Sequence, residues 1–288
     1  MMKIKISVSE RIFQVVNYIF LALLGILCLY PLWHVLMASF SSSEAMYSHS
    51  GLLLWPVDFS VEAYKRVFAN SDIYTGYLNT IKILVLGVSW QMLMTTICAY
   101  VLSRRDFLLR RPVMLIIAFT MFFSGGIIPI YMNIKDLHLL GSVWGLILPM
   151  GINTYNMIIL RTSIESLPES LMEAARIDGA GHLTILRRIV LPLTKATLAV
   201  LVLYYGVAWW NEWFWSSRVL TGKTSLPLAV ILRQILIQND TASMDTGLPI
   251  AETIKYALII VATVPVLCIY PFIQKYFTKG VMIGAVKE

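Results

Sequence analysis

Long apolar runs alternate with short polar segments along almost the whole chain. Six of these runs contain few charges, and each is about as long as a helix must be to cross a hydrocarbon core about 30 Å thick. The runs cover residues 12–37, 77–102, 113–132, 143–160, 197–215 and 256–273. The pattern predicts an all-α, polytopic membrane protein with six transmembrane helices.

Composition supports this class. Hydrophobic residues make up 58% of the 288 residues and charged residues 14%, far from the averages of soluble domains. The net charge of +7 is divided among short clusters between the apolar runs, with no basic face interleaved with aromatic residues, so we expect no nucleic-acid partner. Cys28, Cys98 and Cys268 lie in apolar runs without a CxxC pair, which indicates small buried hydrophobes.

The basic residues indicate the orientation. With the N-terminus inside, most of the 23 Lys and Arg fall on one side, and the positive-inside rule then puts both termini in the cytoplasm. We predict one transmembrane domain over residues 1–288, and no cleaved signal, because the first run is too long for a signal-peptide core. Its connections would be outer loops at 39–76 and 216–255, a cytoplasmic loop at 164–196 and a cytoplasmic tail at 274–288. An apolar run in the second outer loop, LAVILRQILI, is too short to span; it would pack at the interface or dip toward a pore mouth.

The polar cytoplasmic stretch at residues 166–192 reads as two short helices. Ser166 and Glu169 predict a capping box at the start of the first helix, and Gly179 suits a left-handed cap at its end. A second helix is expected over residues 182–190, and it should end at the Leu-Pro pair that follows. Isolated helices shorter than about 12 residues are not stable in water, so both need support, which we expect from another protein.

Motifs for catalysis are missing from the sequence. The four histidines are far apart and form no HExxH, and neither a Gly-x-Ser-x-Gly nor a phosphate-binding GxxxxGK[ST] occurs. We therefore expect no catalytic residue, no metal site and no cofactor in this chain, and an intramembrane enzyme has no positive support. Gly125 and Gly126 indicate a helix break or a close-packing site.

Polar groups at membrane depth mark two further places. In the fourth run, Asn153, Tyr155 and Asn156 lie near the middle, where polar side chains are costly unless they face partners or water. They indicate either a substrate pathway, with a broken helix exposing backbone groups, or a seam between helices.

The fifth run ends in WWNEWFW. Its residues form either an aromatic belt at the membrane surface or a contact for sugar rings, which combine an apolar face with a rim of hydroxyls. The residues in question are Trp209, Trp210, Asn211, Glu212 and Trp213.

The cytoplasmic stretch also carries a motif. Glu173-Ala174-Ala175, three residues, Gly179, nine residues, Ile189, one residue and Leu191-Pro192 resemble, at every spacing, the EAA signature of ABC-importer permease subunits. The fuller EAARIDGA resembles the carbohydrate-uptake branch, to which the maltose permease subunits belong. YPLWHVLMASFS, FSGGIIP, WGLILP, WNEWFW and YFTKGVMIGAVKE extend the resemblance over nearly the whole chain, the second and third toward Gram-positive polysaccharide and oligosaccharide permeases.

This resemblance implies a type I ABC importer permease fold in the bacterial plasma membrane. The EAA helices would act as a coupling helix in a cleft of the ATP-hydrolysing subunit, and the tail would also reach that subunit. The implied coupling residues are Glu173, Ala174, Ala175, Asp178, Gly179, Ile189, Leu191 and Pro192. Leu186 and Ala196 depart from a frequent aromatic residue and a frequent proline of the family.

The resemblance also implies partners. They are a second homologous permease subunit in a heterodimer, a dimer of ATP-binding subunits that hold ATP and Mg, an extracytoplasmic solute-binding protein, a carbohydrate substrate and membrane lipid. The chain would form half of the pathway for an oligosaccharide or polysaccharide fragment, with the substrate held here or mainly by the other permease. The alternatives are the same machinery for a glycerol phosphate or polyol, or a membrane anchor for an ATPase that transports nothing.

Overall fold

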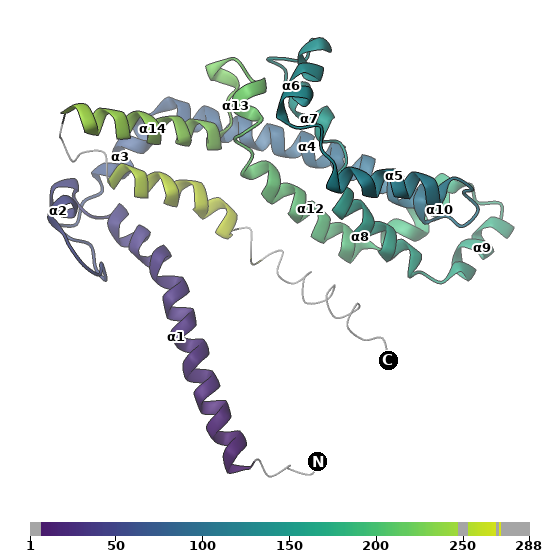
Figure 1. Ribbon diagram of the computed structural model, residues 1–288, viewed down its shortest axis with the longest axis horizontal. Helices are drawn as coiled ribbons and strands as arrows, with labels where there is room; N and C mark the ends of the chain where they lie inside the picture. Colours follow the sequence, from purple (N-terminus) through teal and green to yellow (C-terminus); the bar gives the residue numbers. More distant parts are fainter. Residues whose placement is uncertain (1–6, 247–252, 269–270, 272–288) are drawn as a thin grey trace. The chain divides into compact units, whose positions relative to one another are not determined.

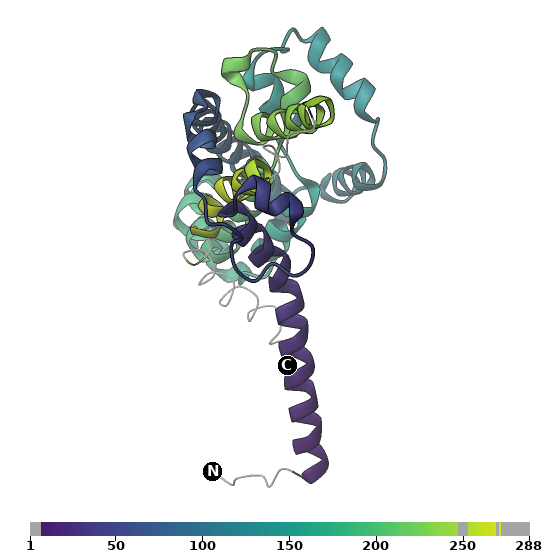
Figure 2. The same ribbon diagram turned by 90° about the vertical axis from the view of Figure 1, so that its left-hand side faces the viewer.

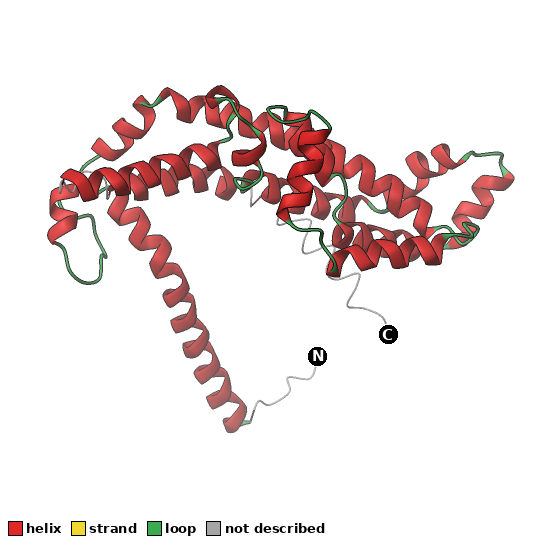
Figure 3. Ribbon diagram, turned by 45° about the horizontal axis from the view of Figure 1, so that its top comes forward, coloured by secondary structure: helices red, strands yellow, loops and turns green. Residues whose placement is uncertain are grey.

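The computed structural model describes residues 7–246, 253–268 and 271. These residues are helical almost throughout, and their one extended pairing is an isolated antiparallel bridge between Ser41 and Phe59 (Figure 3). The predicted all-α class is confirmed. The chain divides into two compact units: the described parts of Met1–Asn70 with Ile235–Val264, and of Ser71–Gln234 with Pro265–Glu288.

The first unit contains one long helix and several short segments. Its helices are α1 (Val8–Ser39), α2 (Ser43–Ser48), α3 (Glu62–Ala69), the last part of α14 (Leu228–Thr246) and most of an unlabelled helix, Thr253–Cys268. Figure 2 shows α1 running away from the loop region of its own unit. Its large apolar side chains are exposed from Val8 to Trp33, and only its last turn is buried, where Met37 and Ala38 pack on Leu53. Such a surface requires lipid or another protein around it.

The second unit is organised around α4 (Ser71–Ser103), against which α8 and α12 pack (Figure 1). The remaining helices follow in chain order. They are α5 (Arg110–Phe122), α6 (Ile127–Asp136), α7 (Val143–Ile147), η1 (Leu148–Met150), α8 (Thr154–Glu165), α9 (Glu169–Ile177), α10 (His182–Ile185), η2 (Leu186–Val190), α11 (Leu191–Leu193), α12 (Lys195–Trp210), α13 (Ser216–Val219) and η3 (Lys223–Ser225), before α14 begins.

One face of α4 is buried and carries mainly small or polar residues, together with Ile73 and Ile83, whereas its other faces are mostly exposed and apolar. The buried positions recur every three or four residues, as one face of a helix requires. They include Gly76, Thr80, Gly87, Gln91, Thr95 and Ala99. Membrane helices pack through such small and polar residues because the apolar positions already suit the lipid. We call this set the α4 polar stripe.

Two described helices, α1 and α4, are each long and apolar enough to cross a membrane. Three pairs pass the same test only when each pair counts as one bent span: α5 with α6, α7–η1 with α8, and the segment His182–Leu193 with α12. The third predicted run, 113–132, is therefore not one straight helix: α5 and α6 meet at 114°, and Gly126 begins α6 with a φ of 88°.

The six-span count and the orientation of the termini stay predictions. The sixth predicted run, 256–273, corresponds to Thr253–Cys268 as far as the structure describes it, and the predicted tail at 274–288 lies outside the described residues.

Candidate functional site

The polar stretch at residues 166–192 begins with α9, which ends as the sequence predicts. Gly179 has a φ of 80°, in the left-handed region that favours glycine. The amide of Ala180 donates to the carbonyl of Ala175 over 2.9 Å, a hydrogen bond that closes a Schellman-type cap. Gly179 therefore turns the chain out of α9 toward the second helical segment.

The capping box expected from Ser166 and Glu169 is wrong. Ser166 is the C-cap of α8, and its hydroxyl donates to the carbonyl of Ser163 over 2.8 Å. Pro168 occupies the N-cap position of α9, and the Glu169 carboxylate pairs with Arg105 at 2.9 Å. Ser166 has the αR backbone of the preceding helix, with φ −78° and ψ −10°, and not the extended conformation of an N-cap, so α9 starts after Pro168 instead.

The second helical segment is longer than expected and is wound unevenly. α10, the π-helical turn η2 and α11 follow one another. The amide of Leu191 donates to the carbonyl of Leu186, five residues back. A proline in an α-helix clashes with the carbonyl four residues back, so this wide turn lets the helix continue through Pro192. The segment then bends by 83° into α12 at Thr194, whose hydroxyl donates to the Val190 carbonyl over 2.8 Å.

One face of these short helices packs on the chain itself. Met172 and Ala175 of α9, together with Ala180 and Leu186, contact an apolar cluster formed mainly by α4 and α8. The buried members of this cluster are Ala99, Tyr100, Leu102, Met157, Leu160, Ile164, Ile185, Val190 and Leu201. Part of the support that the short helices need thus comes from within the protein.

The opposite face is uncovered. Ile177 is 87% exposed, Leu183 59% and Leu171 44%, and Ala174 is exposed between them in sequence. Of the other residues singled out by the motif, Asp178 and Pro192 are exposed, and Ile189 and Leu191 are half-buried. Leu171, Ala174 and Ile177 lie on α9 and Leu183 lies on α10, and such an exposed set of small and large apolar side chains is suited to contact with another protein. We call residues 166–192 the EAA segment, and Leu171, Ala174, Ile177 and Leu183 its outer face.

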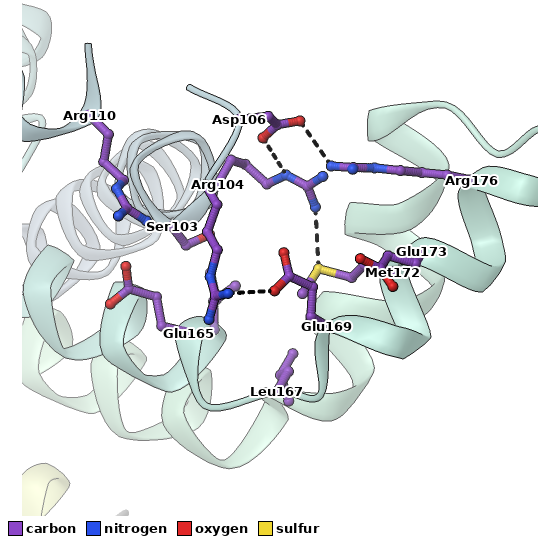
Figure 4. Close-up of a pocket in the computed structure, with 12 residues that line it drawn as sticks. Ser103, Arg104, Asp106, Arg110, Glu165, Leu167, Glu169, Met172, Glu173 and Arg176 are labelled. Atoms are coloured by element: carbon purple, nitrogen blue, oxygen red, sulfur yellow. Dashed lines mark hydrogen bonds and ion pairs between the residues drawn. The ribbon is translucent and has the colours of Figure 1, made fainter. Parts of the chain in front are cut away.

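A charged pocket of about 630 Å³ lies between α9 and the turn that joins α4 to α5 (Figure 4). Arg176 pairs with Asp106 at 3.0 Å, and Asp106 also accepts a longer contact of 3.4 Å from Arg104. A guanidinium nitrogen of Arg104 lies 3.3 Å from the sulfur of Met172. Together with the Arg105–Glu169 pair, these contacts attach α9 to the end of α4 through the α4–α5 turn.

Glu173, the first residue of the motif, also lines this pocket. Its carboxylate is exposed, and within the described part of the chain it forms no ion pair. Figure 4 shows it on the α9 side of the pocket, beside Met172. It is therefore a charge open to a group from outside the chain.

The fourth run breaks at its polar residues. Asn153 is the N-cap of α8, and its side-chain oxygen accepts the amide hydrogen of Asn156 at 3.0 Å. The Asn156 side chain is buried, and Tyr155 is 59% exposed. The geometry gives Asn153 a local part in starting a helix within the apolar run; contact of these residues with a substrate stays a prediction.

The WWNEWFW segment begins in the last turn of α12 and continues into the turn that follows it. Trp209 is buried, and the ring of Trp210 lies 6.3 Å from that of Tyr77. Asn211 donates to the carbonyl of Val207, Glu212 accepts the amide hydrogen of Trp215 at 2.7 Å, and the guanidinium of Arg233 lies 3.6 Å from the centre of the Trp213 ring. Several of these polar groups are thus used within the chain. Sugar contact stays a prediction, and the burial of Trp209 favours an indirect part for that residue.

Gln91 is a polar residue that the sequence analysis did not single out. It is 7% exposed and joins three helical segments: its Nε2 donates to the carbonyl of Met150 over 2.6 Å, and its Oε1 accepts from the indole of Trp209 over 2.7 Å. The signal in the sequence was its position, four residues from Gly87 and four from Thr95, on one face of an apolar run.

Within residues 7–246, 253–268 and 271, no three His, Cys, Asp or Glu side chains lie close enough to hold a metal ion. Cys28, Cys98 and Cys268 are free thiols; Cys28 and Cys268 are exposed and Cys98 is half-buried, so the expectation that all three are buried within the chain is wrong.

Comparison with known proteins shows a similarity over nearly the full length. Residues 91–283 match the family described as "Binding-protein-dependent transport system inner membrane component". The chain is 42% identical over 285 residues to the "Polygalacturonan/rhamnogalacturonan transport system permease protein YtcP" of Bacillus subtilis, covering 97% of this chain and 99% of that protein. It is 37% identical over 284 residues to "Protein LplC" of the same organism, covering 97% and 96%.

A solved structure is similar as well. Its description is "Crystal structure of a bacterial ABC transporter involved in the import of the acidic polysaccharide alginate". One of its chains superimposes on this one with a TM-score of 0.86 and 34% sequence identity, covering 96% of this chain and all of that one.

Proposed function

This chain belongs to the family of binding-protein-dependent transport system inner membrane components, and we propose that it forms one half of the membrane pathway of an ATP-driven importer. The substrate we propose is an oligosaccharide or a polysaccharide fragment. The similarity to a polygalacturonan and rhamnogalacturonan permease, and to an alginate importer, supports this substrate class. In the pathway itself we place Asn153, Tyr155, Asn156 and the segment from Trp209 to Trp213 as lining or supporting residues.

The EAA segment is the proposed contact with the ATP-hydrolysing partner. The observation that carries this role is the two-sided character of α9. One side packs on the cluster between α4 and α8, while the outer face of the EAA segment and the Glu173 carboxylate are left open. A partner cleft that covers Ala174 and Ile177 would bury apolar surface, and a cation there would pair with Glu173. Gly179 provides the left-handed turn that brings the second helical segment back, and Ile189, Leu191 and Pro192 lie in that segment.

The proposed assembly has three further components. A second homologous permease completes the pathway, a dimer of ATP-binding subunits holds ATP and Mg, and a solute-binding protein delivers the carbohydrate outside the cell. Both termini of this chain would lie in the cytoplasm of a bacterium, as the basic residues between its apolar runs favour. This chain would hydrolyse nothing itself.

Reconstitution tests the substrate class. The complex is placed in proteoliposomes with its binding protein and offered galacturonan, alginate and malto-oligosaccharides, glycerol 3-phosphate and a polyol. We expect one of the glycans to stimulate ATP hydrolysis and to accumulate inside. Accumulation of glycerol 3-phosphate or the polyol alone would show that this solute, and not a glycan, is the substrate. ATP hydrolysis without accumulation of any solute would favour the alternative in which the chain only anchors an ATPase in the membrane.

A charge reversal tests the coupling role. Glu173→Lys is expected to lower uptake at least tenfold and to weaken retention of the ATPase during purification, because it places a cation where we propose that a partner cation binds. Asp136→Lys is the matched control, since Asp136 is also an exposed acid, at the end of α6. Wild-type uptake by Glu173→Lys, or an equal loss in both variants, would contradict the assigned role.

A further inference from the structure

The break in the fourth span exposes a backbone acceptor. Between the helical segments on either side, Val143–Met150 and Thr154–Glu165, the chain bends by 51°. In an unbroken α-helix the carbonyl of Met150 would accept from the amide of Thr154, four residues on. Here α8 starts afresh at Thr154, with Asn153 as its cap. In a membrane interior there is no water to replace a lost partner, so such a carbonyl needs another donor.

Gln91 of the α4 polar stripe is that donor. Its Nε2 lies 2.6 Å from the Met150 oxygen, and its Oε1 lies 2.7 Å from the indole nitrogen of Trp209. An indole N–H can only donate and a carbonyl can only accept, so the amide of Gln91 has one possible orientation. Gln91 and Trp209 are 7% and 4% exposed, which keeps water out of both hydrogen bonds.

The surrounding residues fit this arrangement closely. A Cβ atom at Gly87, one turn before Gln91, would overlap the indole ring of Trp209. A Cβ atom at Gly151, in the break itself, would lie 3.0 Å from the indole nitrogen of Trp90. The ring of Trp209 and the chain at the break thus approach α4 where glycine leaves room.

We propose that Gln91 is a positioning residue that couples the break in the fourth span to the end of α12. The proposal rests on the proposed transport function. α12 follows the EAA segment directly and carries Trp209 in its last turn. A shift of the EAA segment displaces α12, and Trp209 and Gln91 carry that displacement to the Met150 carbonyl, where the fourth span bends.

A neighbouring hydrogen bond provides a matched control. The hydroxyls of Thr95 and Tyr205 lie 2.7 Å apart and join the same two helices, one turn from the Gln91–Trp209 pair. Both residues are buried, at 0% and 2% exposure. The Thr95–Tyr205 pair differs from the Gln91–Trp209 pair because it forms no hydrogen bond to the backbone of the break at residues 150–154.

The first test measures amide hydrogen exchange on the assembled complex, and it requires no transport. Gln91→Met removes both hydrogen bonds at similar volume, and we expect exchange at residues 151–157 to become at least tenfold faster. Tyr205→Phe is expected to leave exchange there unchanged. Should Gln91→Met fail to assemble, Trp209→Phe takes its place, since it frees Gln91 from α12 but keeps the bond to Met150; exchange is then expected to rise at least threefold. Equal exchange in wild type and variants would overturn the proposal.

The second test measures how many ATP molecules are hydrolysed for each sugar imported, with galacturonan oligosaccharides as the probe. A purely structural role would reduce the amount of assembled complex but not this ratio. We expect the ratio to rise at least fivefold in Gln91→Met and Trp209→Phe and to stay at the wild-type value in Tyr205→Phe. A wild-type ratio in the first two variants, or an equal rise in all three, would overturn the proposal. If the wild-type complex imports no solute, the proposed function fails, while the exchange experiment still decides whether Gln91 holds the break.

Discussion

On the α4 polar stripe, neutral side chains make hydrogen bonds in the protein interior, whereas around the pocket beside α9, charged side chains pair at the surface. Gln91 and Thr95 are 7% and 0% exposed. The side chains of Arg176 and Asp106 are 41% and 54% exposed. Both regions lie on or next to the same helix, α4, and both connect it to segments far away in the sequence.

The difference concerns what happens when a contact is lost. Water can solvate an exposed charge that loses its partner, and surface ion pairs contribute only about 0–1 kcal/mol. A polar group buried beside α4 has no such replacement, so its loss costs more, about 1–3 kcal/mol. The stripe is suited to fixing one arrangement of helices, and the pocket is suited to contacts that break and form again as a partner moves.

The largest effect is expected where the stripe is tightest. Gly87→Ala forces a methyl group into the ring of Trp209, and overpacking of this kind costs about 3 kcal/mol. We expect a lower melting temperature of the purified chain and a lower yield. Gly206→Ala in α12 is the control, because a Cβ atom there meets nothing within 4 Å. Equal melting temperatures for the two variants would show that the α4 polar stripe tolerates an added methyl group at Gly87.

A smaller effect is expected at the turn of the EAA segment. Gly179→Ala meets no neighbour, so its cost is the left-handed backbone alone, about 1 kcal/mol. The melting temperature should hardly change, because α9 is only partly packed on the chain, whereas the dissociation constant of the ATPase subunit should rise several-fold. Gly181→Ala, two residues on and also without neighbours, has a φ of −71° and should change neither quantity. A clear loss of melting temperature in Gly179→Ala would mean that the segment contributes to the core.

The smallest effect is expected for a surface ion pair. In a double-mutant cycle, Asp106→Asn and Arg176→Gln should give a coupling energy of about 0.5 kcal/mol that disappears in 1 M salt, where charges are screened within about 3 Å. The same cycle for Thr95→Val and Tyr205→Phe should give a larger coupling that does not depend on salt. A salt-independent value for the Asp106–Arg176 pair would remove the distinction between the two regions.

The sequence predicted the helical class, the apolar runs and the glycine cap at Gly179, because each depends on local pattern. It indicated a helix break at Gly125 and Gly126 and gave a broken helix near Asn153 as one of two alternatives, but it predicted no angle at either place and no bend at Thr194. The angles leave the composition of the apolar runs unchanged, so no local pattern reveals them. The Ser166 cap was predicted wrongly, since local spacing does not reveal that the preceding helix extends as far as Ser166.

The role of Gln91 was not predicted from the sequence for a related reason. Its two partners are 59 and 118 residues away, so no window of sequence contains the arrangement. A single glutamine in an apolar run has no spacing of its own, unlike the EAA signature. Contacts that join distant segments are found only once the helices have been placed side by side.

The π turn Leu186–Val190 makes the number of residues in the EAA segment matter for the helix that follows. A π turn accommodates one residue more than an α-helical turn, and each residue of an α-helix advances the chain by about 100° around the axis. Deleting one residue between Gly179 and Pro192 would bring the proline ring against the carbonyl of Arg188 or turn α12 by about a third of a revolution, away from Gln91. An insertion would rotate it the other way. Nine residues separate Gly179 from Ile189. Deleting or inserting one of them would rotate α12 relative to α4.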